Sequence, residues 1–95
     1  METIRLDGGR LARREEAMEL LGQALALPEW WGRNLDALYD CLTEPCCRFR
    51  LELHDQTAME STTFGRLLLR VLEDAAAENP GLEVAWVQDE IVPNG

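Results

Sequence analysis

Residues 26–42 read ALPEWWGRNLDALYDCL, and this stretch is the most informative part of the chain. Its first half is an aromatic loop that contains a proline and a glycine, which both interrupt regular structure. Asn34 is a favourable N-cap, and the spacing that follows predicts a helix to about Thr43. The leucines and Cys41 fall on one side of this helix and the acidic residues on the other, so we expect one buried and one exposed face.

The exposed face is predicted to display two carboxylates, Asp36 and Asp40, with Tyr39 at its border. Two like charges four residues apart cost an isolated helix roughly 0.2–0.5 kcal/mol, so the arrangement favours a role other than helix stability. We interpret this face as a surface that presents carboxylates to a cationic partner. The simpler alternative is that both aspartates are ordinary solvated residues.

The composition indicates a globular, acidic chain. Its 95 residues include 9 Lys and Arg against 18 Asp and Glu, for a formal net charge of −9. Such a chain is repelled by nucleic acid and by anionic membranes and attracted to basic surfaces. No apolar run is long enough to span a bilayer, and the first residues do not resemble a secretion signal. We expect residues 1–95 to form one domain, with 89–95 as a loose tail.

The three cysteines favour a reducing compartment. Cys46 and Cys47 are adjacent, and a bridge between neighbours is strained, so an odd count of this kind is a poor disulfide framework. Their spacing with Cys41 and His54 matches none of the usual zinc patterns. We therefore predict no metal, no cofactor and a cytoplasmic location.

The chain lacks the motifs of common enzyme classes. It has no glycine-rich phosphate loop, no nucleophile elbow and only one histidine that could serve as a base. Asp36 and Asp40 would need burial or a concave site to act as an acid/base pair, and both are predicted to be exposed. We predict that the chain is not an enzyme.

The rest of the chain predicts an α/β fold. Alternating runs indicate strands over 2–6, 49–53 and 82–87, and helical spacing indicates helices over 13–25 and 63–78, with a turn or short helix near 57–61. Asp7-Gly8-Gly9 is a turn signal. The residues of the last helix predicted to face the core are Phe64, Leu67, Leu68, Val71, Leu72 and Ala75. Connections of this length suit a small parallel sheet with helices packed on it, in two or three layers.

The segment from Leu25 to Thr43 resembles the barstar family, which comprises intracellular inhibitors of barnase-type bacterial ribonucleases. The matching residues are Leu25-Ala26-Leu27-Pro28-Glu29, Trp30-Trp31, Gly32 and Asn34-Leu35-Asp36-Ala37-Leu38-Tyr39-Asp40-Cys41-Leu42-Thr43. The element order fits the family over nearly the whole chain. The resemblance implies a three-stranded parallel sheet flanked by helices, and an inhibitor (an immunity protein or antitoxin) without catalysis of its own.

The resemblance also implies which residues contact the ribonuclease. Asp40 would be the central carboxylate, seated where a substrate phosphate binds, and Asp36 would contact the rim of that site. The other expected contacts are Trp30, Asn34, Tyr39, Thr43, Glu44 and Asp74. The implied partner is a basic, extracellular-type, barnase-like ribonuclease, bound one to one by a chain that is a monomer when free.

The chain also departs from the family pattern. Glu44 and Pro45 stand where the family archetype has a glycine and an exposed tryptophan, and Tyr39 replaces a tryptophan. These changes leave open an alternative function, a barstar-like binding or immunity module for a different basic toxin or protein partner.

The tryptophan pair and the glycine after it carry separate predictions. Trp30 and Trp31 could both be core residues, but we expect Trp30 to be exposed and Trp31 to be buried, since aromatic side chains are enriched in interface hot spots. Gly32 is expected to supply a positive φ or a close backbone approach, unless it is an incidental turn glycine.

Overall fold

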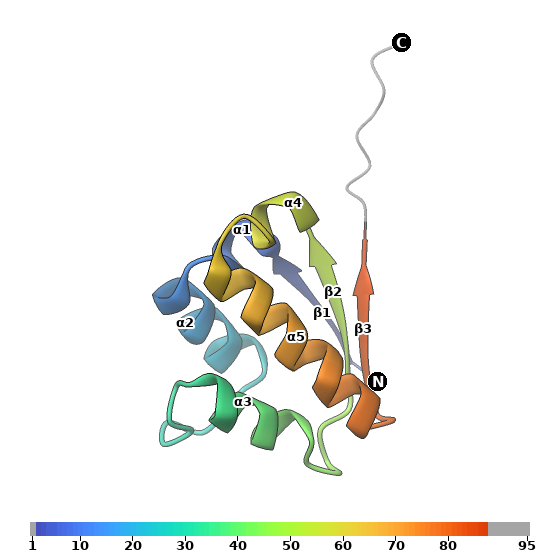
Figure 1. Cartoon of the computed structure of the whole chain (residues 1–95). Helices are drawn as coiled ribbons and strands as arrows, with labels where there is room; N and C mark the ends of the chain where they lie inside the picture. The colour runs from blue at the N-terminus through green and yellow to red at the C-terminus, as the bar shows by residue number, and fades with distance from the viewer. Residues whose placement is uncertain (1, 88–95) are drawn as a thin grey trace.

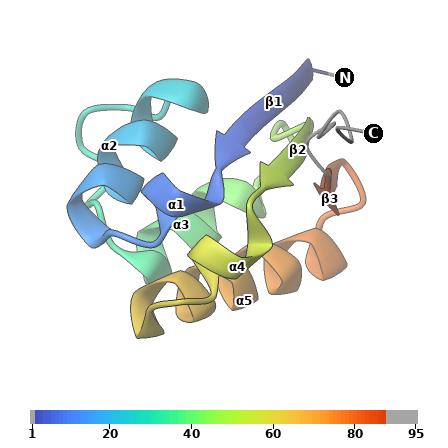
Figure 2. The ribbon, with the colours of Figure 1, turned by 90° about the horizontal axis from the view of Figure 1, so that it is seen from above.

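The computed structural model describes residues 2–87, which form a three-stranded sheet with helices packed on one of its faces (Figure 1, Figure 2). The elements in chain order are β1 (Glu2–Asp7), α1 (Gly8–Leu11), α2 (Arg14–Ala24), α3 (Leu35–Leu42), β2 (Phe49–His54), α4 (Gln56–Met59), α5 (Thr63–Glu78) and β3 (Leu82–Trp86). The strands are parallel in the order β1-β2-β3. The predicted α/β class and parallel sheet are confirmed, in the two-layer arrangement.

The covered face of the sheet forms the core together with the helices. Ile4, Leu51 and Val84 align across the three strands, and Leu51 and Leu53 of the central strand are fully buried. Successive strand residues point to opposite faces. The other face of the sheet, which we call the open face, therefore carries the residues Arg5, Arg50, Glu52 and Glu83.

The arginine and glutamate side chains of the open face form a continuous set of ion pairs. The Glu52 carboxylate accepts hydrogen bonds from Arg5 Nε at 3.2 Å and from Arg50 Nε at 3.1 Å. The Arg50 guanidinium also donates to the Glu83 carboxylate at 2.8 Å. Charges on this face are therefore compensated between neighbouring strands.

The strands and longer helices lie within two residues of their predicted limits, and α1 is the element that the sequence did not predict. Asp7-Gly8-Gly9 was expected to be a turn. Asp7 instead acts as an N-cap, because its carboxylate accepts a hydrogen bond from the Gly9 N–H at 2.9 Å and starts a helical turn.

The predicted core face of α5 is wrong at one position. Leu67 is 49% exposed, whereas Leu69, which was not predicted, is 8% exposed. Both leucines lie at the edges of the same apolar stripe, and helical spacing does not indicate which edge the neighbouring elements cover.

The predicted loose tail, residues 89–95, lies outside the described residues. Among residues 2–87, no helix combines the length and the apolarity that crossing a membrane requires.

Candidate protein-binding surface

α3 is fixed at its start and along its buried side. The Asn34 side chain accepts a hydrogen bond from the Ala37 N–H at 2.7 Å and donates to the Gly32 carbonyl at 3.3 Å. Leu38 and Leu42 are fully buried, and α3 packs along α5. Burial of a leucine contributes about 1.5–3 kcal/mol, so two of them hold this short helix firmly. The predicted cap and buried face are confirmed.

Asp36 and Asp40 stand on the opposite, exposed face of α3. Within residues 2–87 neither side chain makes an ion pair or a hydrogen bond. Asp36 lies in the first turn, where the helix dipole favours a negative charge, but Asp40 lies near the negative end of the helix. A carboxylate there costs about 0.3–1 kcal/mol, and α3 has no basic residue in its last turn to offset it. The position of Asp40 is therefore not explained by helix stability.

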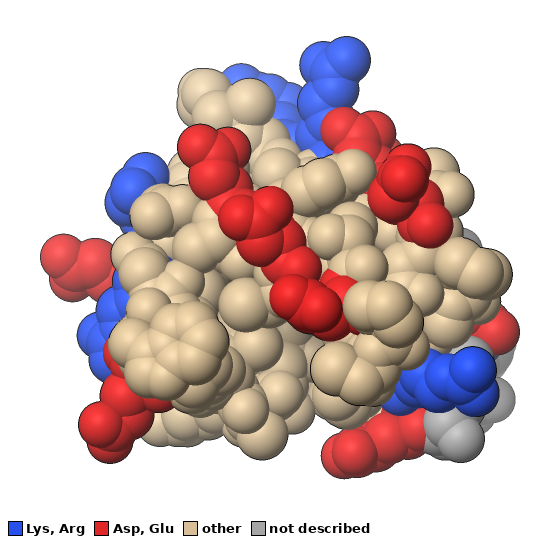
Figure 3. Space-filling model, turned by 90° about the horizontal axis from the view of Figure 1, so that it is seen from below, with Lys and Arg blue, Asp and Glu red and all other residues tan. Residues whose placement is uncertain are grey.

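Three further acidic side chains extend this exposed area. Glu44 follows the end of α3, and Asp74 and Glu78 lie in the last two turns of α5, the neighbouring helix. All three are exposed, and Figure 3 shows acidic side chains gathered across this side of the molecule. We call the set Asp36, Asp40, Glu44, Asp74 and Glu78 the acidic surface.

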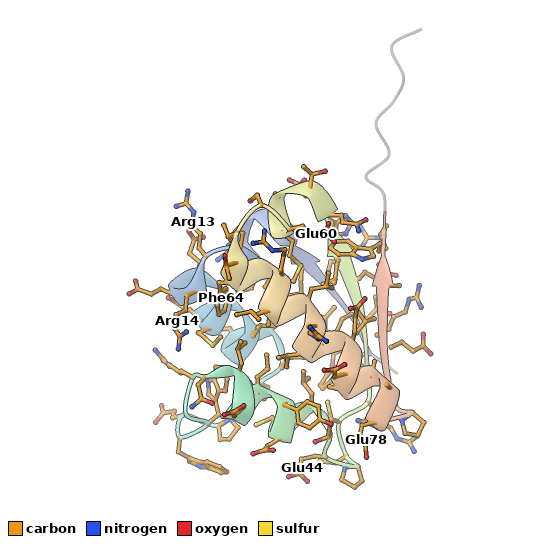
Figure 4. The ribbon with its side chains drawn as sticks, in the orientation of Figure 1. Arg13, Arg14, Glu44, Glu60, Phe64 and Glu78 are labelled. Atoms are coloured by element: carbon orange, nitrogen blue, oxygen red, sulfur yellow. The ribbon has the colours of Figure 1, made fainter. Side chains whose placement is uncertain are left out.

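Glu78 was not among the residues predicted from the sequence. A hollow of about 300 Å³ lies between the two helix ends, and Thr43, Pro45 and Glu78 contribute to its wall. Figure 4 draws Glu44 and Glu78 at the same end of the molecule. Their proximity depends on how α3 packs against α5, so no local sequence signal could have revealed it.

The two tryptophans of the loop before α3 differ in solvent exposure, as expected. Trp30 is 83% exposed and Trp31 is 4% exposed. The Trp31 indole packs on α2 at Gly22, where a Cβ would lie 3.2 Å from Nε1. Trp31 therefore anchors the loop, and Trp30 is displayed close to the start of α3.

The loop backbone is strained. Ala26, Gly32 and Arg33 have φ angles of 52°, 89° and 49°, in the left-handed region. For a residue with a side chain this conformation costs roughly 1–2 kcal/mol. The predicted positive φ of Gly32 is confirmed, and such strain tends to collect at functional sites.

The predicted contacts Asn34 and Thr43 also have structural roles within α3. The Thr43 hydroxyl donates to the Tyr39 carbonyl at 2.8 Å and so closes the last turn of α3. Its lone pairs remain available to accept a hydrogen bond from a partner. Tyr39 is half-buried. Asn34 and Thr43 thus hold the ends of the helix in addition to any contact with a partner.

The chain has three free cysteines close to this surface, of which Cys46 is exposed. Among residues 2–87 there is no group of three His, Cys, Asp or Glu that could hold a metal ion. Burial, together with the negative charges of Asp40 and Glu44, raises the pKa of the Cys41 thiol, and burial also raises the pKa of Cys47. Both stay protonated at neutral pH, and the thiol form is neither a nucleophile nor a metal ligand.

Comparison with known proteins places the chain in a family. A segment of 43 residues is 44% identical to a Bacillus subtilis (strain 168) protein named "Putative ribonuclease inhibitor YrdF". The segment covers 45% of this chain and 47% of that protein, so the match spans about half of the relative's length. A family model described as "Barstar (barnase inhibitor)" matches residues 1–87, a description of an inhibitor and not of an enzyme. The chain belongs to the Barstar family.

Proposed function

We propose that this chain inhibits a small basic ribonuclease by filling its active site with α3 and the preceding loop. The observation that carries the proposal is that Asp36 and Asp40 are exposed and unpaired on a helix held by its cap and its buried leucines. A ribonuclease binds an anionic phosphate in a basic cleft, and a carboxylate on a rigid helix can occupy the same place. In this proposal Asp40 is the central carboxylate and Asp36 contacts the rim.

The other candidate contacts surround this pair. Trp30 offers a large exposed aromatic surface and Tyr39 a half-exposed one, which suits hot-spot contacts. Glu44, Asp74 and Glu78 contribute long-range attraction to a basic partner. Asn34 and Thr43 supply polar contacts at the two ends of α3.

The proposed partner is a basic, barnase-like ribonuclease, bound one to one in the cytoplasm. The net charge of −9 and the family's description as barnase inhibitors support the nature of the partner. Three free cysteines are compatible with a reducing compartment.

A second candidate function is the inhibition or binding of a different basic target. Glu44, Pro45 and Cys46 are all exposed at one edge of the acidic surface. Pro45 cannot provide the aromatic contact that a tryptophan would. This edge therefore suits a partner whose binding site is lined differently from that of barnase.

The test is a titration of barnase with the purified chain while RNA cleavage is followed. We expect activity to fall linearly to zero at one equivalent, and Asp40→Ala to abolish the sharp end point. Glu60→Gln is the matched control, because it removes one negative charge at the opposite end of the molecule from Glu44 and Glu78 (Figure 4).

Full activity of barnase and of other small basic ribonucleases at excess inhibitor would contradict the proposal. The second candidate is supported if the chain then binds a basic protein that is not a nuclease and Asp40→Ala prevents that binding.

A further inference from the structure

We propose that Asn79 is the positioning residue of the acidic surface, because its buried side chain ties the end of α5 to the segment that leaves α3. The inference rests on the proposed function, since the tie fixes the edge of the inhibitory surface. Asn79 follows the last residue of α5 as its C-cap and is only 7% exposed. It is the one polar residue in the buried core of residues 2–87.

The Asn79 side chain has every polar group in use. The two hydrogens of its Nδ2 donate to the carbonyls of Leu42 at 2.8 Å and Cys47 at 2.9 Å, and one of them is shared with the Glu44 carbonyl at 3.3 Å. Its Oδ1 accepts a hydrogen bond from the Gly81 N–H at 2.9 Å. One side chain therefore joins the end of α3, the segment 43–47 and the turn before β3.

The Leu42 carbonyl has a particular need for a donor, because it is among the last four of α3, which no later N–H of the same helix can satisfy. The Glu44 and Cys47 carbonyls belong to the irregular segment between α3 and β2. The Glu44 carbonyl also accepts a hydrogen bond from the Cys47 N–H at 2.9 Å, which closes a turn within this segment. The Asn79 side chain therefore ties a segment with its own internal turn to the end of α5, and without this donor the segment would keep fewer links to α5.

The tie joins two segments that both carry acidic side chains. Glu44 lies on one of the joined segments and Glu78 on the other, next to Asn79 itself, at the same end of the molecule (Figure 4). Arg48 lines the same hollow as Glu78 and Asn79. The neutral amide of Asn79 holds the two segments together without adding a further positive charge to the acidic surface.

The backbone around Asn79 suits this role. Pro80 follows, and the residue before a proline is confined to extended conformations; Asn79 has φ −113° and ψ 105°. The helix must therefore end here. Binding is stronger when a surface is ordered before the partner arrives, because less conformational entropy is lost on association.

The first part of the test needs no partner. Amide hydrogen exchange is measured for the wild-type chain and for Asn79→Ala, with Asn79→Ser as a second variant that keeps a hydroxyl donor if the alanine variant does not fold. We expect exchange to accelerate selectively at Gly81, whose N–H loses its acceptor, and at the non-proline residues of 43–47, relative to β1 and β2. Equal acceleration throughout the chain, or none, would overturn the proposed tie.

The second part uses barnase and asks whether Asn79 acts through Glu44. Kd is measured for Glu44→Gln and for Trp30→Ala, each in the wild-type and in the Asn79→Ala background, and corrected for the folded fraction. We expect Asn79→Ala to raise Kd a few-fold, by no more than Glu44→Gln does, because the tie acts through the position of Glu44. The contribution of Glu44 should disappear in the Asn79→Ala background, while that of Trp30 should be unchanged, as expected for sites that do not share a partner.

An unchanged contribution of Glu44 in both backgrounds would show that Asn79 only stabilises the fold, and would overturn its positioning role. Failure of the wild-type chain to inhibit barnase and other small basic ribonucleases would contradict the proposed function instead. The hydrogen-exchange result decides on the tie in either case.

Discussion

The open face of the sheet and the acidic surface both carry carboxylates, but they compensate them differently. On the open face, Glu52 is paired with Arg5 and Arg50, and Glu83 is paired with Arg50. On the acidic surface, none of the five carboxylates has an ion-pair partner within residues 2–87. The first arrangement is complete within the chain, whereas the second leaves its charge uncompensated and is consistent with a cationic partner.

The largest effect is expected at the centre of the acidic surface. Asp40→Asn keeps the shape of the side chain and removes its charge, so binding to barnase should weaken by about 2–5 kcal/mol, as when one member of a buried charge pair is lost. The free energy of unfolding should instead rise by about 0.3–1 kcal/mol, because a negative charge leaves the C-terminal end of α3. Inhibition assays and urea denaturation measure the two quantities. Loss of both stability and binding would indicate that Asp40 is a structural residue.

The next largest effect concerns the loop that presents Trp30. Gly32→Ala places a side chain at φ 89° and 3.2 Å from the Ala37 Cβ. We expect the free energy of unfolding to fall by about 1–2 kcal/mol, the cost of the left-handed conformation. Gly9→Ala is the matched control, because its Cβ would meet no atom closer than 3.4 Å. Equal stability of the two variants in urea would show that the loop can relax.

The sequence predicted most of the surface that lies within one segment. Asn34 as a cap, the buried leucines of α3 and the different exposure of Trp30 and Trp31 all follow from local spacing and side-chain chemistry, and the structure bears them out. Features that join distant segments were not predicted. The nearness of Glu78 to Thr43 depends on how two helices pack, and so does the contact of Asn79 with the end of α3.

The errors in the fold have the same cause. α1 was missed because a carboxylate followed by two glycines is compatible with both a turn and a helix cap, and the packing of the short helix against its neighbours decides between them. Leu67 was placed in the core because its spacing is right for one face of α5, although the neighbouring elements cover the side of Leu69 instead.

A smaller effect is expected at the edge of the acidic surface. Glu44→Gln should lower the rate of association with barnase a few-fold at low salt, and it should also reduce the dependence of that rate on ionic strength, because peripheral charges act mainly by steering. Glu83→Gln removes the same charge from the open face and should change the rate less. Stopped-flow measurements at several salt concentrations distinguish them. Equal effects would mean that net charge matters and its position does not.

The smallest effect on binding is expected at Glu52, which should affect only the free energy of unfolding and its dependence on pH. Hydrogen bonds from Arg50 and Arg5 hold the pKa of Glu52 below its usual value of 4.5. Because the pKa is lower in the folded than in the unfolded state, the stabilisation is present above about pH 4.5 and is lost as the pH falls through the folded-state pKa.

The comparison variant for this pH dependence is Glu52→Gln. Its free energy of unfolding should lie below that of the wild type at pH 6, and the two curves should converge in acid. Its inhibition of barnase should be unchanged. A constant difference at all pH values would show that the ionised carboxylate is not the stabilising group.

The central claim is that the uncompensated carboxylates, and not the paired ones, meet the partner. Amide chemical shifts of the isotopically labelled chain, recorded during a titration with barnase, test it most directly. We expect large changes over residues 30–44 and in the last two turns of α5, with the signals of Arg5, Arg50, Glu52 and Glu83 unmoved. Changes centred on the open face, with residues 30–44 unaffected, would contradict the claim.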